Sequence, residues 1–106
     1  MLELALAAAK QAELSVNIFT GRVVSGDQFI SRKDKKEWLV ETFDGTCAEM
    51  EGASIGHVAS LNKIPYLIVR AISDKADDSA EMDYPSFAAM AIDNSVALMT
   101  EFVKLC

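Results

Sequence analysis

Pro65-Tyr66-Leu67-Ile68-Val69-Arg70-Ala71-Ile72-Ser73-Asp74 carries the strongest fold signal in this chain of 106 residues. Residues 65–72 are almost continuously apolar, which is typical of a parallel β-strand covered on both faces. In an open α/β sheet, ligands bind in the crevice beyond the carboxyl ends of the strands. The stretch therefore predicts an α/β fold and directs attention to Ser73 and Asp74, which follow the apolar run.

Helical and strand patterns precede and follow this stretch. The first residues are rich in Ala and Leu, which have high helix propensity. The last segment begins near Pro85, which suits a first helical turn, and carries two apolar stripes that predict a helix covered on two sides. β-Branched and aromatic residues before Gly26 favour a strand. We expect helices at residues 2–14, 31–43, 51–61 and 85–105, and strands at residues 17–25, before Glu51 and at residues 65–72.

The alternation of strand and helix predicts an α/β domain with about two or three strands. A typical sheet has about four to six strands. The chain is long enough for one domain at most. We therefore expect residues 1–106 to form only part of a larger domain.

The charge balance argues against nucleic acid as the ligand. The net charge is −6, whereas proteins that bind a phosphate backbone concentrate positive charge on one face. Residues 31–43 contain Arg32, Lys33, Lys35 and Lys36, which would suit a basic patch. Acidic residues are interleaved with them, so a helix with one solvated face is the favoured interpretation.

Cysteine and histidine are too rare for a typical metal site. The chain has Cys47, Cys106 and the single histidine His57, without a Cys-x-x-Cys spacing. Cys47 is expected to be a small buried hydrophobe and His57 a structural residue of a packed helix. We expect no metal and no cofactor. The sequence shows no signal-peptide pattern and no apolar run of membrane-spanning length, so a reducing cytoplasm is the expected location.

Glu49-Met50-Glu51 places charge at the end of a predicted buried element. Such charge requires a ligand or a partner. A regular strand through Glu49 and Glu51 would direct both side chains to one side, so we expect the strand to give way to helix near Glu51. Arg70 is a plausible partner for Glu49. A structural ion pair and a direct ligand contact are both open for these two residues.

Three stretches in order resemble one family. Val24–Ile30, Ala48–Ala53 and Val69–Asp77 are similar to motifs in the C-terminal half of bacterial 5'-methylthioadenosine/S-adenosylhomocysteine nucleosidases, which belong to the purine nucleoside phosphorylase superfamily. The resemblance covers essentially the whole chain. It implies the C-terminal part of a three-layer αβα fold with a mixed sheet flanked by helices. The N-terminal half of the domain is then absent, and a homodimer is expected for the full-length protein.

The resemblance implies hydrolysis of the bond between adenine N9 and ribose C1' through an oxocarbenium-like transition state. Asp74 then protonates the purine at N7, and Ser73 helps to orient Asp74 or the purine. Asp74 must hold a proton near neutral pH. This requires its pKa to rise by roughly 3 units from about 3.9, which costs about 4 kcal/mol. Burial at the end of the strand at residues 65–72 is the expected source of that shift.

The same resemblance assigns the substrate contacts. Glu51 accepts hydrogen bonds from the ribose hydroxyls, and Met50 packs against the sugar. Phe29 stacks on adenine while the backbone of Ile30 reads the purine edge, although core packing would also explain an aromatic residue at Phe29. Tyr84 lines the pocket for the 5'-alkylthio group, or is only a helix-entry residue.

Two other functions remain open at this stage. A purine nucleoside phosphorylase would use phosphate in place of water, and a related hydrolase acts on adenine-bearing futalosine compounds. A third possibility is a noncatalytic fragment, because in the family the glutamate that activates water lies in the N-terminal half. In each case the expected partner is a small nucleoside, not a nucleic acid or a membrane.

Overall fold

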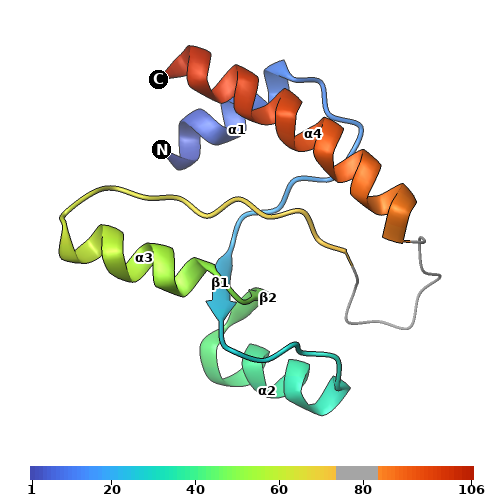
Figure 1. Ribbon diagram of the computed structural model, residues 1–106, viewed down its shortest axis with the longest axis vertical. Coiled ribbons are helices and arrows are strands. Elements are labelled where there is room, and N and C mark those ends of the chain that lie inside the picture. Colours follow the sequence, from blue (N-terminus) through green and yellow to red (C-terminus); the bar gives the residue numbers. More distant parts are fainter. Residues whose placement is uncertain (74–83) are drawn as a thin grey trace. The chain divides into compact units, whose positions relative to one another are not determined.

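The computed structural model describes residues 1–73 and 84–106, which divide into two compact units. Unit 1 comprises Met1–Ile18 and Val69–Cys106, and unit 2 comprises Phe19–Ile68. Figure 1 shows the helices and strands of both units. Because the units are separate bodies, each is described by itself.

Unit 1 is a pair of helices. Helix α1 (Leu2–Gln11) packs against helix α4 (Tyr84–Leu105), and Ala8 and Ala9 of α1 are the buried hydrophobic residues of the described chain. Their small side chains permit close approach of the helices. Both helices were predicted, with α1 ending three residues earlier than expected. Among the described residues, no helix has the length and apolar character needed to cross a membrane.

Only one of the two apolar stripes of α4 is covered. The first stripe is composed of Phe87, Met90, Ala91, Leu98 and Phe102, and all of these except the exposed Met90 are half-buried. The second stripe, composed of Ile92, Val96, Met99 and Val103, is exposed. The expectation that the helix is covered on two sides is therefore wrong for the described structure. The physical reason is that α1 is the only other helix in the described part of unit 1.

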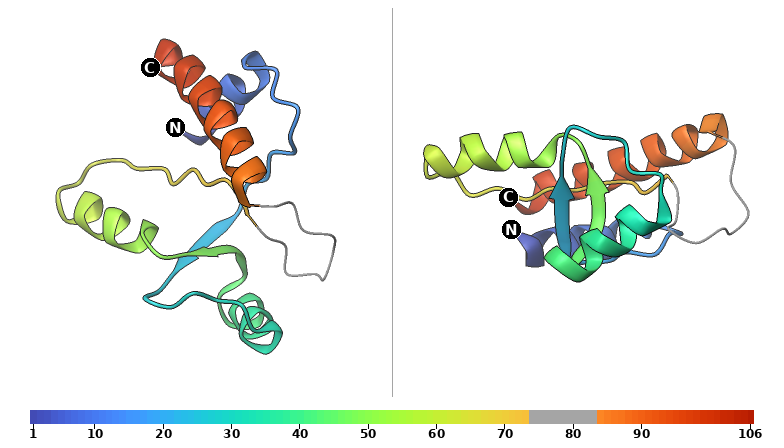
Figure 2. Two further views of the ribbon diagram at one scale, coloured as in Figure 1. Left: turned by 45° about the vertical axis from the view of Figure 1, so that its right-hand side comes forward. Right: turned by 90° about the horizontal axis from the view of Figure 1, so that it is seen from below.

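Unit 2 is built on a two-stranded parallel sheet. Strand β1 (Arg22–Ser25) pairs with β2 (Gly45–Glu49), and helix α2 (Lys33–Phe43) connects them. The two strands lie side by side and run in the same direction in Figure 2. This β-α-β unit confirms the α/β class. Strand β1 is shorter than the predicted strand at residues 17–25.

Arg22 joins the start of β1 to the end of α2. Its guanidinium donates a hydrogen bond to the Phe43 carbonyl over 2.6 Å, and its backbone N–H donates to Thr46 Oγ1 over 3.2 Å. The carbonyls in the last turn of a helix lack partners within the helix, so Arg22 satisfies one of them. The helix ends at Phe43, and the next residue, Asp44, adopts a left-handed conformation with φ of 53°.

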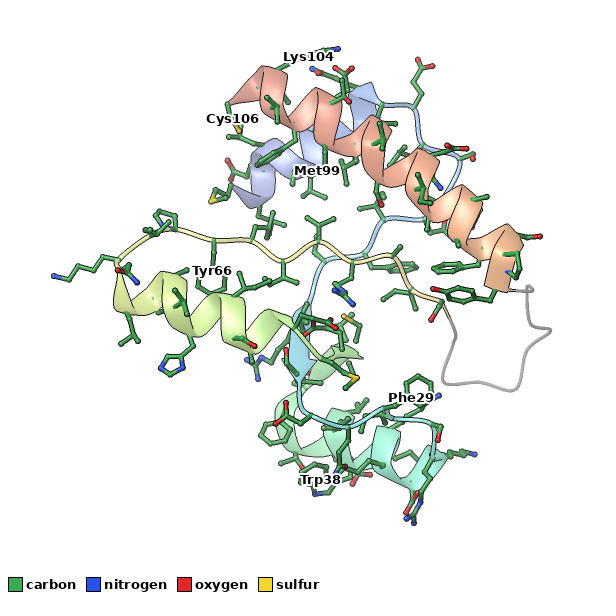
Figure 3. The ribbon with its side chains drawn as sticks, viewed as in Figure 1. Phe29, Trp38, Tyr66, Met99, Lys104 and Cys106 are labelled. Carbon is green, nitrogen blue, oxygen red and sulfur yellow. The ribbon has the colours of Figure 1, made fainter. Side chains whose placement is uncertain are left out.

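Helix α3 (Gly52–Leu61) follows β2 almost at once and confirms the predicted helix. Its two buried residues, Gly52 and Gly56, are four apart and so share one helix face. A Cβ atom on Gly56 would lie 3.0 Å from the ring of Tyr66. Figure 3 shows the Tyr66 side chain directed toward α3. The small residues of this helix therefore allow close packing, as their sequence suggested.

The prediction of a β-strand at residues 65–72 is wrong. These residues belong to neither a helix nor a strand, and Tyr66, Val69 and Ile72 are exposed. Apolar content favours a strand only where a neighbouring strand supplies ladder hydrogen bonds. The sheet in the described residues consists of β1 and β2 alone, and neither strand pairs with this segment.

Candidate functional site

The carboxyl ends of β1 and β2 form one edge of the sheet in unit 2. Ser25, the last residue of β1, is the register partner of Glu49, the last residue of β2. The backbone continues this pairing, because Gly26 N–H donates to the Glu49 carbonyl over 3.2 Å. Parallel strands therefore deliver the two segments that follow them to the same edge. Those segments are the loop with Phe29 and Ile30, and Met50-Glu51.

The Glu49 carboxylate organises this edge. It accepts hydrogen bonds from the backbone N–H of Glu51 over 3.0 Å and of Gly52 over 2.7 Å, and a further one from the Ser25 hydroxyl. Ser25 Oγ in turn accepts a hydrogen bond from Ala53 N–H over 2.9 Å. The first N–H groups of a helix have no partner within the helix. Glu49 and Ser25 thus satisfy the amide groups at the start of α3, and the carboxylate also complements the positive end of the helix dipole.

Met50 and Glu51 occupy the two-residue junction between strand and helix. Strand β2 ends at Glu49 and helix α3 begins at Gly52, which confirms the predicted change of structure near Glu51. Glu51 is exposed, and the Met50 side chain is 44% exposed. Both side chains therefore lie at the surface of unit 2, where a ligand can reach them.

Phe29 and Ile30 lie in the loop between β1 and α2. The Phe29 side chain is 77% exposed, and Figure 3 shows it directed away from α2. Ile30 is half-buried. Phe29 therefore does not pack into a core of the described residues. An exposed aromatic ring presents a face on which a planar base can stack.

The remaining predicted site residues belong to unit 1 or lie outside the described residues. Arg70 and Ser73 lie near the start of the second segment of unit 1, Val69–Cys106, and Tyr84 is the first residue of α4. The Tyr84 side chain is 74% exposed, with its ring centroid 6.4 Å from that of Phe87. The candidate general acid, Asp74, lies outside the described residues. Glu49 and Arg70 belong to different units, so their ion pair stays a prediction.

Ser25 is a functional candidate that sequence reasoning missed. Ser25 lies within the motif Val24–Ile30, in which the resemblance assigns roles to Phe29 and Ile30 only. The signal that identifies Ser25 is its position as the last residue of a parallel strand beside a carboxylate at the end of the next. His57 is exposed on α3 and Cys47 is half-buried in β2.

A comparison with protein families identifies the superfamily. A family model described as Phosphorylase superfamily matches residues 1–104 of this chain. The chain belongs to the phosphorylase superfamily. The fold expected from the sequence motifs, part of a nucleoside phosphorylase-like α/β domain, is thereby confirmed.

Relatives within the phosphorylase superfamily include several nucleosidases. The chain is 40% identical over 104 residues to aminodeoxyfutalosine nucleosidase of Campylobacter jejuni, which covers 97% of this chain and 43% of that protein. It is 40% identical over 80 residues to 5'-methylthioadenosine/S-adenosylhomocysteine nucleosidase of Treponema pallidum, covering 74% of this chain and 30% of that protein.

A solved structure from the same superfamily has a similar fold. The crystal structure of 5'-methylthioadenosine/S-adenosylhomocysteine nucleosidase from Campylobacter jejuni superimposes with a TM-score of 0.78 at 35% sequence identity. The match covers 99% of this chain and 44% of that chain. This chain therefore spans less than half the length of the superfamily members that it matches.

Proposed function

We propose that the full-length protein carrying this sequence hydrolyses the N-glycosidic bond of a 5'-substituted adenine nucleoside and releases adenine. The observation that carries the proposal is the common edge of β1 and β2, where the loop with Phe29 and Ile30 and the Met50-Glu51 junction leave the sheet together. Base-binding and ribose-binding groups need this proximity, because base and sugar are adjacent parts of one small molecule. The similarity to nucleosidases along 97% of the chain supports the same chemistry.

The proposed substrates share an adenine, a ribose and a substituent at the 5' position. The named relatives act on 5'-methylthioadenosine and S-adenosylhomocysteine, or on aminodeoxyfutalosine. The first two would place the protein in methionine salvage and the activated methyl cycle. In this proposal Phe29 stacks on the adenine and the Ile30 backbone reads its edge. Tyr84 contacts the 5' group.

Cleavage of the N-glycosidic bond is proposed to depend on stabilising the negative charge that develops on adenine and the positive charge that develops on the ribose. Asp74 donates a proton to adenine N7, so that the base leaves as a neutral molecule, and Ser73 orients the acid or the base. Glu51 accepts hydrogen bonds from the ribose hydroxyls, and Met50 packs on the sugar, which holds the ring as positive charge develops at C1'. Arg70 balances carboxylate charge near the site. No metal or cofactor takes part in these steps.

Water is the proposed acceptor of the ribosyl group. The amide groups of residues 51–53 at the start of α3 already bind Glu49 and Ser25. A helix N-terminus is a common place for a phosphate to bind. Since this one is filled by the chain's own side chains, a phosphate co-substrate would need a site elsewhere.

The proposal extends to the assembly. In this proposal, residues of unit 2 contact the base and the ribose, and none of the described residues of unit 2 is assigned to activate water. We assign that group to the part of the full-length protein that corresponds to the unmatched length of the relatives. A cytoplasmic homodimer is the proposed working form.

Adenine release by the full-length protein tests this function. The purified protein is incubated with 5'-methylthioadenosine, S-adenosylhomocysteine and aminodeoxyfutalosine, with and without phosphate. We expect adenine release without phosphate, and a loss of at least about 100-fold in kcat for Asp74→Asn, because general acid catalysis contributes about that much or more. The relative kcat/KM values identify the preferred substrate. Undiminished turnover by Asp74→Asn would refute the acid role, and dependence on phosphate would assign the protein as a phosphorylase.

A further inference from the structure

The carboxylate of Glu49 is largely occupied by groups of its own chain. A carboxylate offers about four positions for hydrogen-bond donors. The Ser25 hydroxyl and the backbone N–H groups of Glu51 and Gly52 use three donors on its two oxygens, and Gly52 N–H lies within 2.9 Å of one oxygen and 2.7 Å of the other. A substrate hydroxyl at Glu49 would therefore compete with bonds that already exist.

These bonds fix the geometry of the junction on which Glu51 lies. The carboxylate at the end of β2 holds the N–H of Glu51 itself and the N–H of the first residue of α3. Ser25 ties the same start of α3 to the end of β1 through Ala53. The position of the Glu51 backbone is thus set by two strand ends and one helix start together.

We propose that Glu49 is a positioning residue, supported by Ser25, that holds Glu51 in place for the ribose hydroxyls, and that Glu49 itself does not contact substrate. The inference rests on the proposed function only for the role of Glu51. Its structural part, that the Glu49 carboxylate anchors the start of α3, stands on the hydrogen bonds alone. Replacement by glutamine keeps the size of the side chain but loses the charge and one acceptor oxygen, so it cannot reproduce the paired acceptance.

The test measures how much kcat/KM falls when one ribose hydroxyl is removed from the substrate. The full-length protein and its Glu49→Gln and Ser25→Ala variants are assayed with 5'-methylthioadenosine and with its 2'-deoxy and 3'-deoxy derivatives. Glu41→Gln, an exposed carboxylate on α2, is the matched control. In the wild-type protein, removing a hydroxyl bound by a carboxylate should lower kcat/KM about 10- to 100-fold.

If Glu49 positions Glu51, the effect of removing a ribose hydroxyl on kcat/KM should depend on whether Glu49 is present. We define the hydroxyl penalty as the ratio of kcat/KM for 5'-methylthioadenosine to kcat/KM for its deoxy derivative, measured in the same variant. In Glu49→Gln we expect this penalty to be less than about threefold, because Glu51 is no longer held where the hydroxyl lies. Ser25→Ala should give an intermediate penalty, and Glu41→Gln should match the wild type. A loss of stability alone would lower the activity toward all substrates equally and would leave the penalty unchanged.

Amide hydrogen exchange separates this inference from the proposed function. We expect the amides of residues 51–53 to exchange at least about tenfold faster in Glu49→Gln than in Glu41→Gln, since their acceptor is weakened. If the wild-type protein released no adenine, this difference would still support the anchoring role. An unchanged hydroxyl penalty or unchanged exchange at residues 51–53 would overturn the inference. If Glu49→Gln does not fold, the same two readouts in Ser25→Ala decide the question.

Discussion

Gly52 is the residue at which a single added carbon should disturb the candidate site most. A Cβ atom at this position would lie 2.7 Å from Oε1 and 3.1 Å from the carboxyl carbon of Glu49. The Gly52→Ala variant must therefore displace the carboxylate from the start of α3. Alanine gains about 0.5–1 kcal/mol in a helix, but the lost charge-assisted bonds cost more, so we expect a net loss of about 1–2 kcal/mol in the free energy of unfolding.

Urea denaturation of the full-length protein measures this loss. Gly26→Ala is the matched control, because a Cβ atom on Gly26 would meet nothing within 4 Å. We expect the control to change the unfolding free energy by less than about 0.5 kcal/mol. Equal denaturation midpoints for Gly52→Ala and Gly26→Ala would show that the carboxylate can move aside without cost.

Residue types and spacing predict the position of the charged motif Glu49-Met50-Glu51, but they do not predict which hydrogen bonds Glu49 accepts. The pattern Glu49-Met50-Glu51 marked a site, and the change from strand to helix at Glu51 followed from the period of side chains along a strand. Which donors reach Glu49 depends on the register of β1 against β2, because that register places Ser25 beside it. A register between segments 24 residues apart is a property of pairing, and neither segment encodes it alone.

At the scale of elements, helix α3 depends on a close contact between Gly56 and Tyr66. The Tyr66 ring would lie 3.0 Å from a Cβ atom on Gly56, and this side chain is 48% exposed. We expect Gly56→Leu to lower the free energy of unfolding by about 1–3 kcal/mol, since leucine favours a helix and only the clash can account for a loss.

A double-mutant cycle assigns that loss to the contact. Tyr66→Ala removes the ring, so Gly56→Leu should cost less in its presence, with a coupling of at least about 0.5 kcal/mol in urea denaturation. Ser54→Leu, on an exposed position of the same helix, serves as the control. Strictly additive free energies would mean that the segment after α3 does not pack on it.

The elements that were predicted correctly are those whose signal is local. Helices α1, α2, α3 and α4 follow from helix propensity, apolar periodicity and small residues, all of which act within one segment. The strand expected at residues 65–72 failed because a strand needs a partner, and apolar character reports only a tendency to be buried. The second stripe of α4 was likewise predicted to be buried from its apolar character alone, but no described residues cover it.

At the scale of the whole molecule, α4 carries an apolar stripe that no other described element covers. The stripe is formed by Ile92, Val96, Met99 and Val103. These residues are spaced at i, i+4, i+7 and i+11, which places them on one helix face, and each of them is exposed. The chain spans 43% of a relative that matches nearly all of it. If the full-length protein has the length of that relative, as proposed above, its further residues are available as a cover. We expect the stripe to be buried in that protein.

Introducing a charge into the stripe tests this expectation. Val96→Lys should lower the free energy of unfolding of the full-length protein by about 2 kcal/mol or more, because it removes an apolar side chain from a buried contact and replaces it with a cation. Ser86→Lys adds the same charge at an exposed position of α4 that is neither three nor four residues from any member of the stripe, and it should have a much smaller effect. Similar losses in the two variants would mean that the stripe stays exposed to solvent.

The isolated 106-residue chain should respond to the same substitution in the opposite direction. With its stripe uncovered, we expect this chain to self-associate and to release little or no adenine, since it lacks the proposed water-activating group. Val96→Lys should reduce the self-association, as measured by light scattering, whereas Ser86→Lys should not. Adding the remaining part of the full-length protein should restore adenine release to the wild-type chain and less well to Val96→Lys. A monodisperse and active isolated chain would contradict both expectations at once, because it would need neither a cover for α4 nor a second half of the site.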